Sequence, residues 1–205
     1  MISALDALAR LREGNKRFAT EDQTRAPIKR SDLVAGQDPI AIILGCSDSR
    51  VPAEIVFDQG LGDLFVIRVA GNIVAASQVG SVEFAAARFS TRLVVVLGHT
   101  HCGAIEATIE ELQRPTVNQS RNLRSIVDRV APSVETLLAA DLKLDQTAIV
   151  RHAVRANVRA SANHLRHGSE ILEQLIQNEG LLVVGAEYSL ETGIVDFFDH
   201  MPLAK

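Results

Sequence analysis

The chain contains no tryptophan, one tyrosine and only two cysteines among its 205 residues. Two cysteines are too few for a disulfide framework. The sequence also lacks a basic surplus, because 21 Lys and Arg stand against 25 Asp and Glu and the formal net charge is −4. Nonspecific binding to nucleic acid is therefore disfavoured. No apolar run approaches the roughly 18 residues that a membrane span needs, so we expect neither a nucleic-acid nor a membrane partner.

What the sequence does contain is typical of a globular protein. Hydrophobic residues make up 47% of the chain and charged residues 22%, which excludes disordered and fibrous classes. A chain of this length is predicted to form a single domain over residues 1–205. The N-terminus carries an acid at Asp6 and has no basic segment followed by an apolar one, so it does not resemble a signal peptide. A cytoplasmic location is therefore expected.

Short apolar runs predict the architecture. Continuous runs of this kind are typical of strands buried on both faces of a sheet. The helical pattern of residues 77–89 joins two of them, which suggests a parallel crossover, and residues 181–198 read as a closing hairpin. We therefore predict an α/β fold with a central, mostly parallel β-sheet flanked by helices. The predicted strands are residues 40–45, 64–69, 92–98 and 181–186.

Two further segments read as helical. Residues 2–18 have helical apolar spacing and, with the polar stretch that follows, form an N-terminal helical arm over residues 1–38. Residues 118–178 predict a helical insertion before the last strands, with two or three helices and breaks at Pro132 and Gly168. The insertion also carries an arginine stripe, which we expect to be hydrated. Its members are Arg151, Arg155, Arg159 and Arg166.

Potential metal ligands lie in the loops that follow the first and third apolar runs. Loops at the carboxyl ends of neighbouring parallel strands converge, so Cys46, His99 and Cys102 are expected to meet. Thiolate and imidazole are ligands that Zn²⁺ prefers, and a catalytic zinc site uses three protein ligands with a fourth position for water. Asp48 could fill that fourth position instead. A disulfide or two buried apolar thiols are the alternatives, and the polar neighbours disfavour the latter.

Asp48 and Arg50 are two residues apart in the first of these loops, close enough for a bidentate ion pair. The pair could be purely structural. In the functional interpretation, Arg50 holds Asp48 away from the metal, and Asp48 accepts a hydrogen bond from the metal-bound water and orients it.

These motifs together resemble a β-class carbonic anhydrase over essentially the whole chain. The matching segments are GNKRF at 14–18, CSDSRVP at 46–52, GDLFVIRVAGN at 62–72, VVLGHTHCGA at 95–104 and GAEYSLETG at 185–193. The resemblance implies an enzyme, a lyase, that uses zinc (Zn2+) to hydrate carbon dioxide reversibly to bicarbonate and a proton, with zinc-bound hydroxide as the attacking species. It implies zinc on Cys46, His99 and Cys102 and a catalytic Asp48–Arg50 dyad.

The resemblance also implies a substrate pocket and an assembly. It places the backbone amide near Gly103 in the pocket, Gln37 as a hydrogen-bond donor to substrate across a dimer interface, and Phe65 and Phe84 as pocket walls, for which plain core packing is the alternative. A homodimer or a dimer of dimers is expected, with the arm of residues 1–38 packing on the partner subunit.

The resemblance leaves two states of Asp48 and two rival functions open. Family members that favour a closed state, with the aspartate on zinc at low pH, often have tryptophan three residues before the first zinc cysteine. Ile43 occupies that position here, which favours the open state near neutral pH. The rival functions are a zinc hydrolase of carbon disulfide or carbonyl sulfide with the same fold, and a non-catalytic zinc-dependent interaction or redox-sensing protein.

Overall fold

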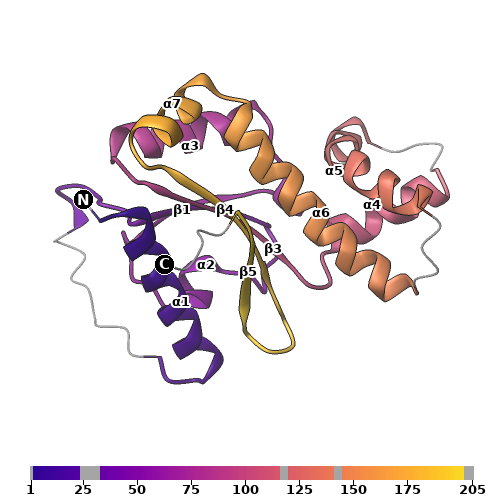
Figure 1. Cartoon of the computed structure of the whole chain (residues 1–205). Helices are drawn as coiled ribbons and strands as arrows, with labels where there is room; N and C mark the ends of the chain where they lie inside the picture. The colour runs from indigo at the N-terminus through magenta and orange to yellow at the C-terminus, as the bar shows by residue number, and fades with distance from the viewer. Residues whose placement is uncertain (1, 24–32, 116–119, 141–144, 201–205) are drawn as a thin grey trace.

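One five-stranded sheet forms the centre of the molecule, in the order β2–β1–β3–β4–β5 (Figure 1). The computed structural model describes residues 2–23, 33–115, 120–140 and 145–200. The first four strands pair in parallel and β5 pairs antiparallel with β4, so the predicted mostly parallel sheet and its closing hairpin are confirmed. The strands are β1 (Ala41–Gly45), β2 (Leu64–Arg68), β3 (Leu93–His99), β4 (Leu182–Tyr188) and β5 (Val195–Asp199).

Helices cover both faces of the sheet, which explains why the central strands are continuously apolar. Every residue of β1 and β3 is buried. On one face, α3 (Ala76–Arg88), α6 (Gln146–His167) and α7 (Glu170–Asn178) pack over alternate strand residues, and Val82, Val158 and Leu172 belong to the same buried cluster as Val94 and Val96. Burying each such side chain stabilises the fold by about 1.5–3 kcal/mol.

The opposite face of the sheet is covered by α1 (Ala4–Ala19) and the short α2 (Ala53–Val56). Ser3 caps α1, because its hydroxyl oxygen accepts a hydrogen bond from the backbone N–H of Asp6 at 3.1 Å. Leu8 and Leu11 then pack in one buried cluster with sheet residues. The apolar stripe of α1 is therefore used within its own chain. Residues 24–32 of the predicted arm lie outside the described residues.

The predicted helical insertion contains α5 (Arg121–Ala139), α6 and α7, and α4 (Gly103–Gln113) precedes it. Gly168 follows the last residue of α6, as predicted. The predicted break at Pro132 is wrong, because α5 continues through that residue. Pro132 is exposed, whereas Val130 and Val134 beside it are fully buried. Their packing offsets the roughly 3 kcal/mol that an internal proline costs a helix.

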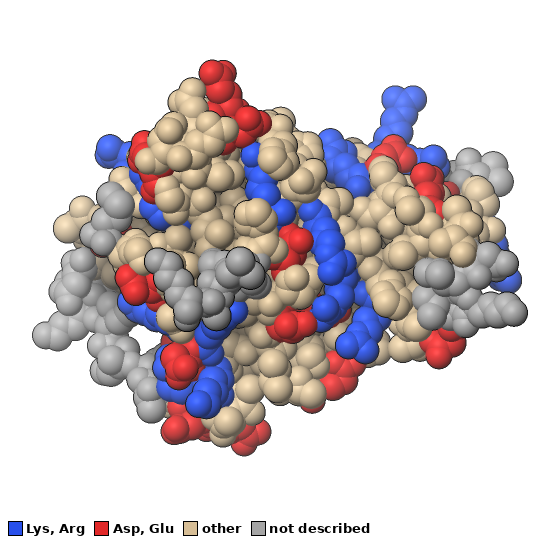
Figure 2. All heavy atoms as spheres, in the orientation of Figure 1, with Lys and Arg blue, Asp and Glu red and all other residues tan. Residues whose placement is uncertain are grey.

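The prediction of a hydrated arginine stripe on α6 is wrong for two of its members. Arg155 donates to Glu187 at 2.7 Å and also bonds to Asp196, and Arg166 donates to Asp199 at 2.6 Å. The β4–β5 hairpin brings these carboxylates beside α6. Figure 2 accordingly shows basic side chains along the middle of this face with acidic side chains next to them.

Candidate metal centre

The three predicted ligands meet where β1 and β3 end. Cys46 directly follows β1, His99 is the last residue of β3, and Cys102 is the residue before the first turn of α4. Since β1 and β3 are parallel neighbours, both chain exits lie at the same edge of the sheet. The fold therefore places a soft-ligand cluster at the sheet's carboxyl edge.

The donor atoms of Cys46, His99 and Cys102 lie within 4.8 Å of one another. The two sulfur atoms are 4.0 Å apart. Two thiolates on one tetrahedral zinc ion would be about 3.8 Å apart, given Zn–S bonds of about 2.3 Å. The three residues are 5%, 0% and 1% exposed, so the cluster is largely shielded from bulk water. The spacing fits one tetrahedral ion.

The hydrogen bonding of His99 settles which ring nitrogen is available. Its Nδ1 lies 2.8 Å from the carbonyl oxygen of Thr100, and because a carbonyl only accepts, Nδ1 carries the proton. Nε2 is buried and has no hydrogen-bond partner among the described residues. A buried imidazole nitrogen beside two cysteine sulfurs, in a ring oriented by the hydrogen bond of the other nitrogen, is what a metal ion of the zinc type requires. The residues present therefore fit such an ion.

The two cysteines differ in their tendency to ionise. Hydrogen bonding between the two sulfur atoms, 4.0 Å apart, lowers the pKa of Cys46, and the backbone N–H of Gly71, which donates to the same sulfur at 3.3 Å, adds to this effect. The negative sulfur of Cys46 in turn raises the pKa of Cys102. A cation bound between the two sulfurs would favour ionisation of both thiols.

Asp48 lies beside this cluster and forms a bidentate ion pair with Arg50. The Nε and Nη2 groups of Arg50 donate to the two carboxylate oxygens at 2.9 and 2.7 Å. These hydrogen bonds hold the pKa of Asp48 well below its usual range. Oδ2 of Asp48 is 3.9 Å from Nε2 of His99. The carboxylate is thus ionised, close to the three ligands and engaged by Arg50, as the spacing in the sequence predicts.

Comparison with known proteins identifies the family. A family model described as carbonic anhydrase matches residues 41–195. A solved structure of the β-carbonic anhydrase CafA of Aspergillus fumigatus superposes with a TM-score of 0.77 and 26% identity, over 97% of this chain and 91% of that one. The chain belongs to the β-class carbonic anhydrase family.

Relatives of this carbonic anhydrase cover it almost end to end. Carbonic anhydrase 2 of Mycobacterium tuberculosis is 38% identical over 194 residues, which span 93% of this chain and 91% of the relative. A Sordaria macrospora structure described as a tetrameric β-carbonic anhydrase has a TM-score of 0.74 at 23% identity, over 94% of this chain and 97% of that one. The latter similarity supports the fold alone.

Three residues that the sequence analysis did not assign support the candidate metal centre of this carbonic anhydrase. Arg68 donates from Nε to the carbonyl oxygen of Cys46 at 2.9 Å and from Nη2 to that of Asp48. Gly71, at φ +69°, directs its N–H at the Cys46 sulfur, while Asn157 on α6 donates to the Gly71 carbonyl at 2.8 Å. Arg68 and Gly71 lie within segment 62–72, which matched the family in the sequence analysis, although no role was assigned to either residue there.

Of the predicted pocket residues, Gly103 lies next to the ligands. It is the first residue of α4, where backbone N–H groups lack partners within the helix. A Cβ at Gly103 would meet no atom within 4 Å, so the space beside it is open. Gln37 is exposed in the segment before β1.

Phe65 and Phe84 lie away from the ligands of their own chain. Phe65 pairs with Ile42, four residues before Cys46, which is roughly 13 Å along the strand direction. Phe84 on α3 is 54% exposed, and its ring packs against Phe65 with centroids 6.2 Å apart. Within one chain, these rings form an apolar surface and do not wall the metal centre.

Proposed function

We propose that this carbonic anhydrase hydrates carbon dioxide reversibly to bicarbonate and a proton, with one zinc ion on Cys46, His99 and Cys102. The observation that carries the proposal is Nε2 of His99, which is buried close to two cysteine sulfurs and has no hydrogen-bond partner among the described residues. The adjoining Asp48–Arg50 pair supplies the groups that position water. Zinc bound here would supply a Lewis acid that makes hydroxide available near neutral pH.

The chain's own residues would do the positioning. Hydrogen bonding from Arg50 is the main reason that the pKa of Asp48 is low, and it makes this carboxylate a weak base. Asp48 therefore accepts a hydrogen bond from the attacking water without taking its proton. Arg50 also donates to the carbonyl oxygen of His101 at 3.1 Å, which ties the first strand-exit loop to the second. The backbone N–H of Gly103 would donate to a substrate oxygen.

Stopped-flow hydration of carbon dioxide by the zinc-loaded protein tests this proposal, with carbon disulfide as the comparison substrate. We expect hydration of carbon dioxide and little turnover of carbon disulfide. The intact Asp48–Arg50 pair disfavours a non-catalytic interaction or redox-sensing role. Turnover of carbon disulfide alone, or of neither substrate, would refute the proposal.

The rate of hydration is expected to rise with pH between about 7 and 8.5. Two thiolates would cancel the charge of a divalent ion held by this site. The pKa of water there is therefore expected to lie above the value of about 7 that is typical of a three-histidine zinc site. The attacking species is deprotonated, which makes the rate increase towards higher pH. Asp48 contributes no titration in this range, because its pKa lies far below it. The measurement is kcat/KM against pH, and a flat profile from about 6.5 to 9 would contradict the prediction.

We further propose that a second copy of the chain completes each substrate pocket. The exposed ring of Phe84 and its neighbour Phe65 form an apolar surface far from their own ligands, so they can line a pocket only from a partner subunit. Gln37, exposed before β1, would reach substrate in the same way.

None of the described helices has both the length and the hydropathy needed to cross a bilayer. A cytoplasmic location is proposed because the thiolates of Cys46 and Cys102 require a reducing compartment.

The Phe84→Glu variant is expected to convert a dimer, or dimer of dimers, into a monomer with strongly reduced activity. A charge on this apolar surface would have to be desolvated when the copies associate. Light scattering at micromolar concentration and a carbon dioxide assay measure the two effects. Leu123→Glu is the matched control, because Leu123 is similarly exposed but lies on α5. A wild-type protein that is active as a monomer would contradict the proposed assembly.

A further inference from the structure

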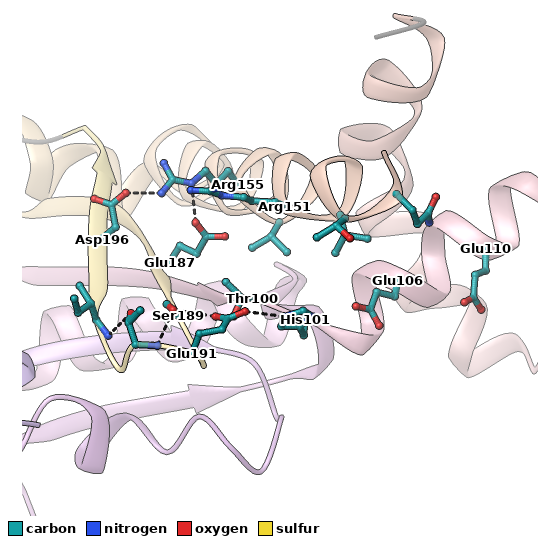
Figure 3. Close-up of a pocket in the computed structure, with 16 residues that line it drawn as sticks. Thr100, His101, Glu106, Glu110, Arg151, Arg155, Glu187, Ser189, Glu191 and Asp196 are labelled. Atoms are coloured by element: carbon teal, nitrogen blue, oxygen red, sulfur yellow. Dashed lines mark hydrogen bonds and ion pairs between the residues drawn. The ribbon is translucent and has the colours of Figure 1, made fainter. Parts of the chain in front are cut away.

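A cavity of about 650 Å³ lies between α4, α6 and the β4–β5 hairpin (Figure 3). Thr100 and His101, which connect the proposed zinc ligands His99 and Cys102, form part of its wall, but the ligands themselves do not line it. Carboxylates outnumber guanidinium groups in the lining by five to two, so the cavity is acidic. The five carboxylates belong to Glu106, Glu110, Glu187, Glu191 and Asp196.

Glu187 is the buried member of this set, with 5% of its surface exposed. Its Oε2 accepts a hydrogen bond from Nε of Arg155 at 2.7 Å, and Arg155 also bonds to Asp196. Its Oε1 is buried and finds no hydrogen-bond donor in the part of the chain that the structure describes. Figure 3 shows the carboxylate of Glu187 below Arg155, facing the cavity. A buried oxygen without a donor is costly, so a ligand that brings an N–H group there is favoured.

Four of the five acidic groups lie at two ends of the cavity, and Glu191, which accepts a hydrogen bond from Thr100, lies between them. Glu187 and Asp196 come from the hairpin, and Glu106 and Glu110 come from α4 at the other end (Figure 3). The lining residues of α6 run from Gln146 to Arg155, a span of about 13 Å at 1.5 Å per residue. Between the ends, α6 contributes apolar wall. The apolar lining residues are Val150 and Val154 from α6 and Ile194 from the hairpin.

We propose that this cavity binds an aliphatic diamine, with one ammonium group on Glu187, the other near Glu106 and Glu110, and the methylene chain against Val150 and Val154. A single metal ion could not reach both acidic ends. An anion would face a surplus of carboxylates. The proposal depends neither on zinc nor on the hydration activity.

Arg151 provides a sign test of the ligand's charge. It is an exposed lining residue that forms no ion pair within the described ranges, whereas Arg155 is neutralised by Glu187 and Asp196. A cationic ligand is repelled by Arg151, and an anionic ligand is attracted by it. Arg151→Gln should therefore strengthen the binding of a diamine.

Isothermal titration calorimetry of the full-length, zinc-loaded protein with 1,5-diaminopentane tests the proposal. We expect saturable binding of about one molecule per chain, at least about tenfold tighter than that of 1-aminopentane. Glu187→Gln should weaken it by about tenfold or more, because a charged hydrogen bond is lost. Tetramethylammonium chloride at equal ionic strength controls for nonspecific charge effects.

Exposed Glu110 offers a second variant in case Glu187→Gln disturbs the fold. Glu110→Gln should also weaken diamine binding, by a smaller factor, without changing the melting temperature. The absence of saturable binding, or heats no different from those of tetramethylammonium, would overturn the proposal. Unchanged affinity for the diamine in both Glu187→Gln and Glu110→Gln would also overturn it, as would weaker diamine binding in Arg151→Gln. Inorganic phosphate that binds wild type but not Arg151→Gln would show an anion site instead.

Discussion

The Cys102→Ala variant is expected to lose most of its bound zinc, and carbon dioxide hydration should fall to background with it. The change leaves Cys46 and His99 as the only two of the three proposed ligands, whereas a catalytic zinc site uses three. The fold should survive, because Cys102 precedes α4 without a side-chain capping bond. The loss should therefore be one of metal and activity and not of secondary structure.

Elemental analysis of purified wild type and Cys102→Ala measures the zinc content, about one ion per wild-type chain. Ser47→Ala serves as the control, because Ser47 adjoins Cys46 in the same loop but is exposed and lies outside the ligand cluster. It should retain full zinc. Full zinc in Cys102→Ala would remove this cysteine from the ligand set.

The Asp48→Asn variant is expected to keep its zinc and to lose on the order of 10²-fold or more in turnover. The amide keeps the size of the carboxylate but presents only one acceptor oxygen. It also loses the charge that binds Arg50 through two hydrogen bonds. The attacking water would no longer be oriented. Stopped-flow kcat with parallel metal analysis measures both effects, and a fully active variant would contradict the assigned role.

Arg50→Ala should also be slow, by a different route. Without the guanidinium, Asp48 is free to turn towards the proposed metal position, since its Oδ2 is already 3.9 Å from Nε2 of His99. It would then bind zinc as a fourth ligand and exclude water. X-ray absorption at the zinc edge near pH 7.5 distinguishes the two variants, because an additional carboxylate ligand is expected only in Arg50→Ala. The same zinc environment in both would argue against the holding role of Arg50.

The sequence alone determined the architecture and which side chains meet at the candidate metal centre. Strands β1 and β3 are buried on both faces, so their residues form unbroken apolar runs that are visible without any structure. The carboxyl ends of parallel strands lie at the same edge of a sheet, so Cys46 and His99 were expected to lie close together. The Asp48–Arg50 pair was equally accessible, because two residues in one loop need no tertiary information to meet.

Tertiary structure alone decided which groups complete and surround that centre. The support of Cys46 by Arg68 and Gly71 joins residues more than twenty positions apart. The neutralisation of Arg155 by Glu187 depends on how α6 lies across the β4–β5 hairpin, and the sequence pattern suggested a hydrated side chain instead. Periodicity reports which face of an element is apolar, but not which polar groups another element brings to the opposite face. Those contacts follow from the register and packing of whole elements, which no local pattern encodes.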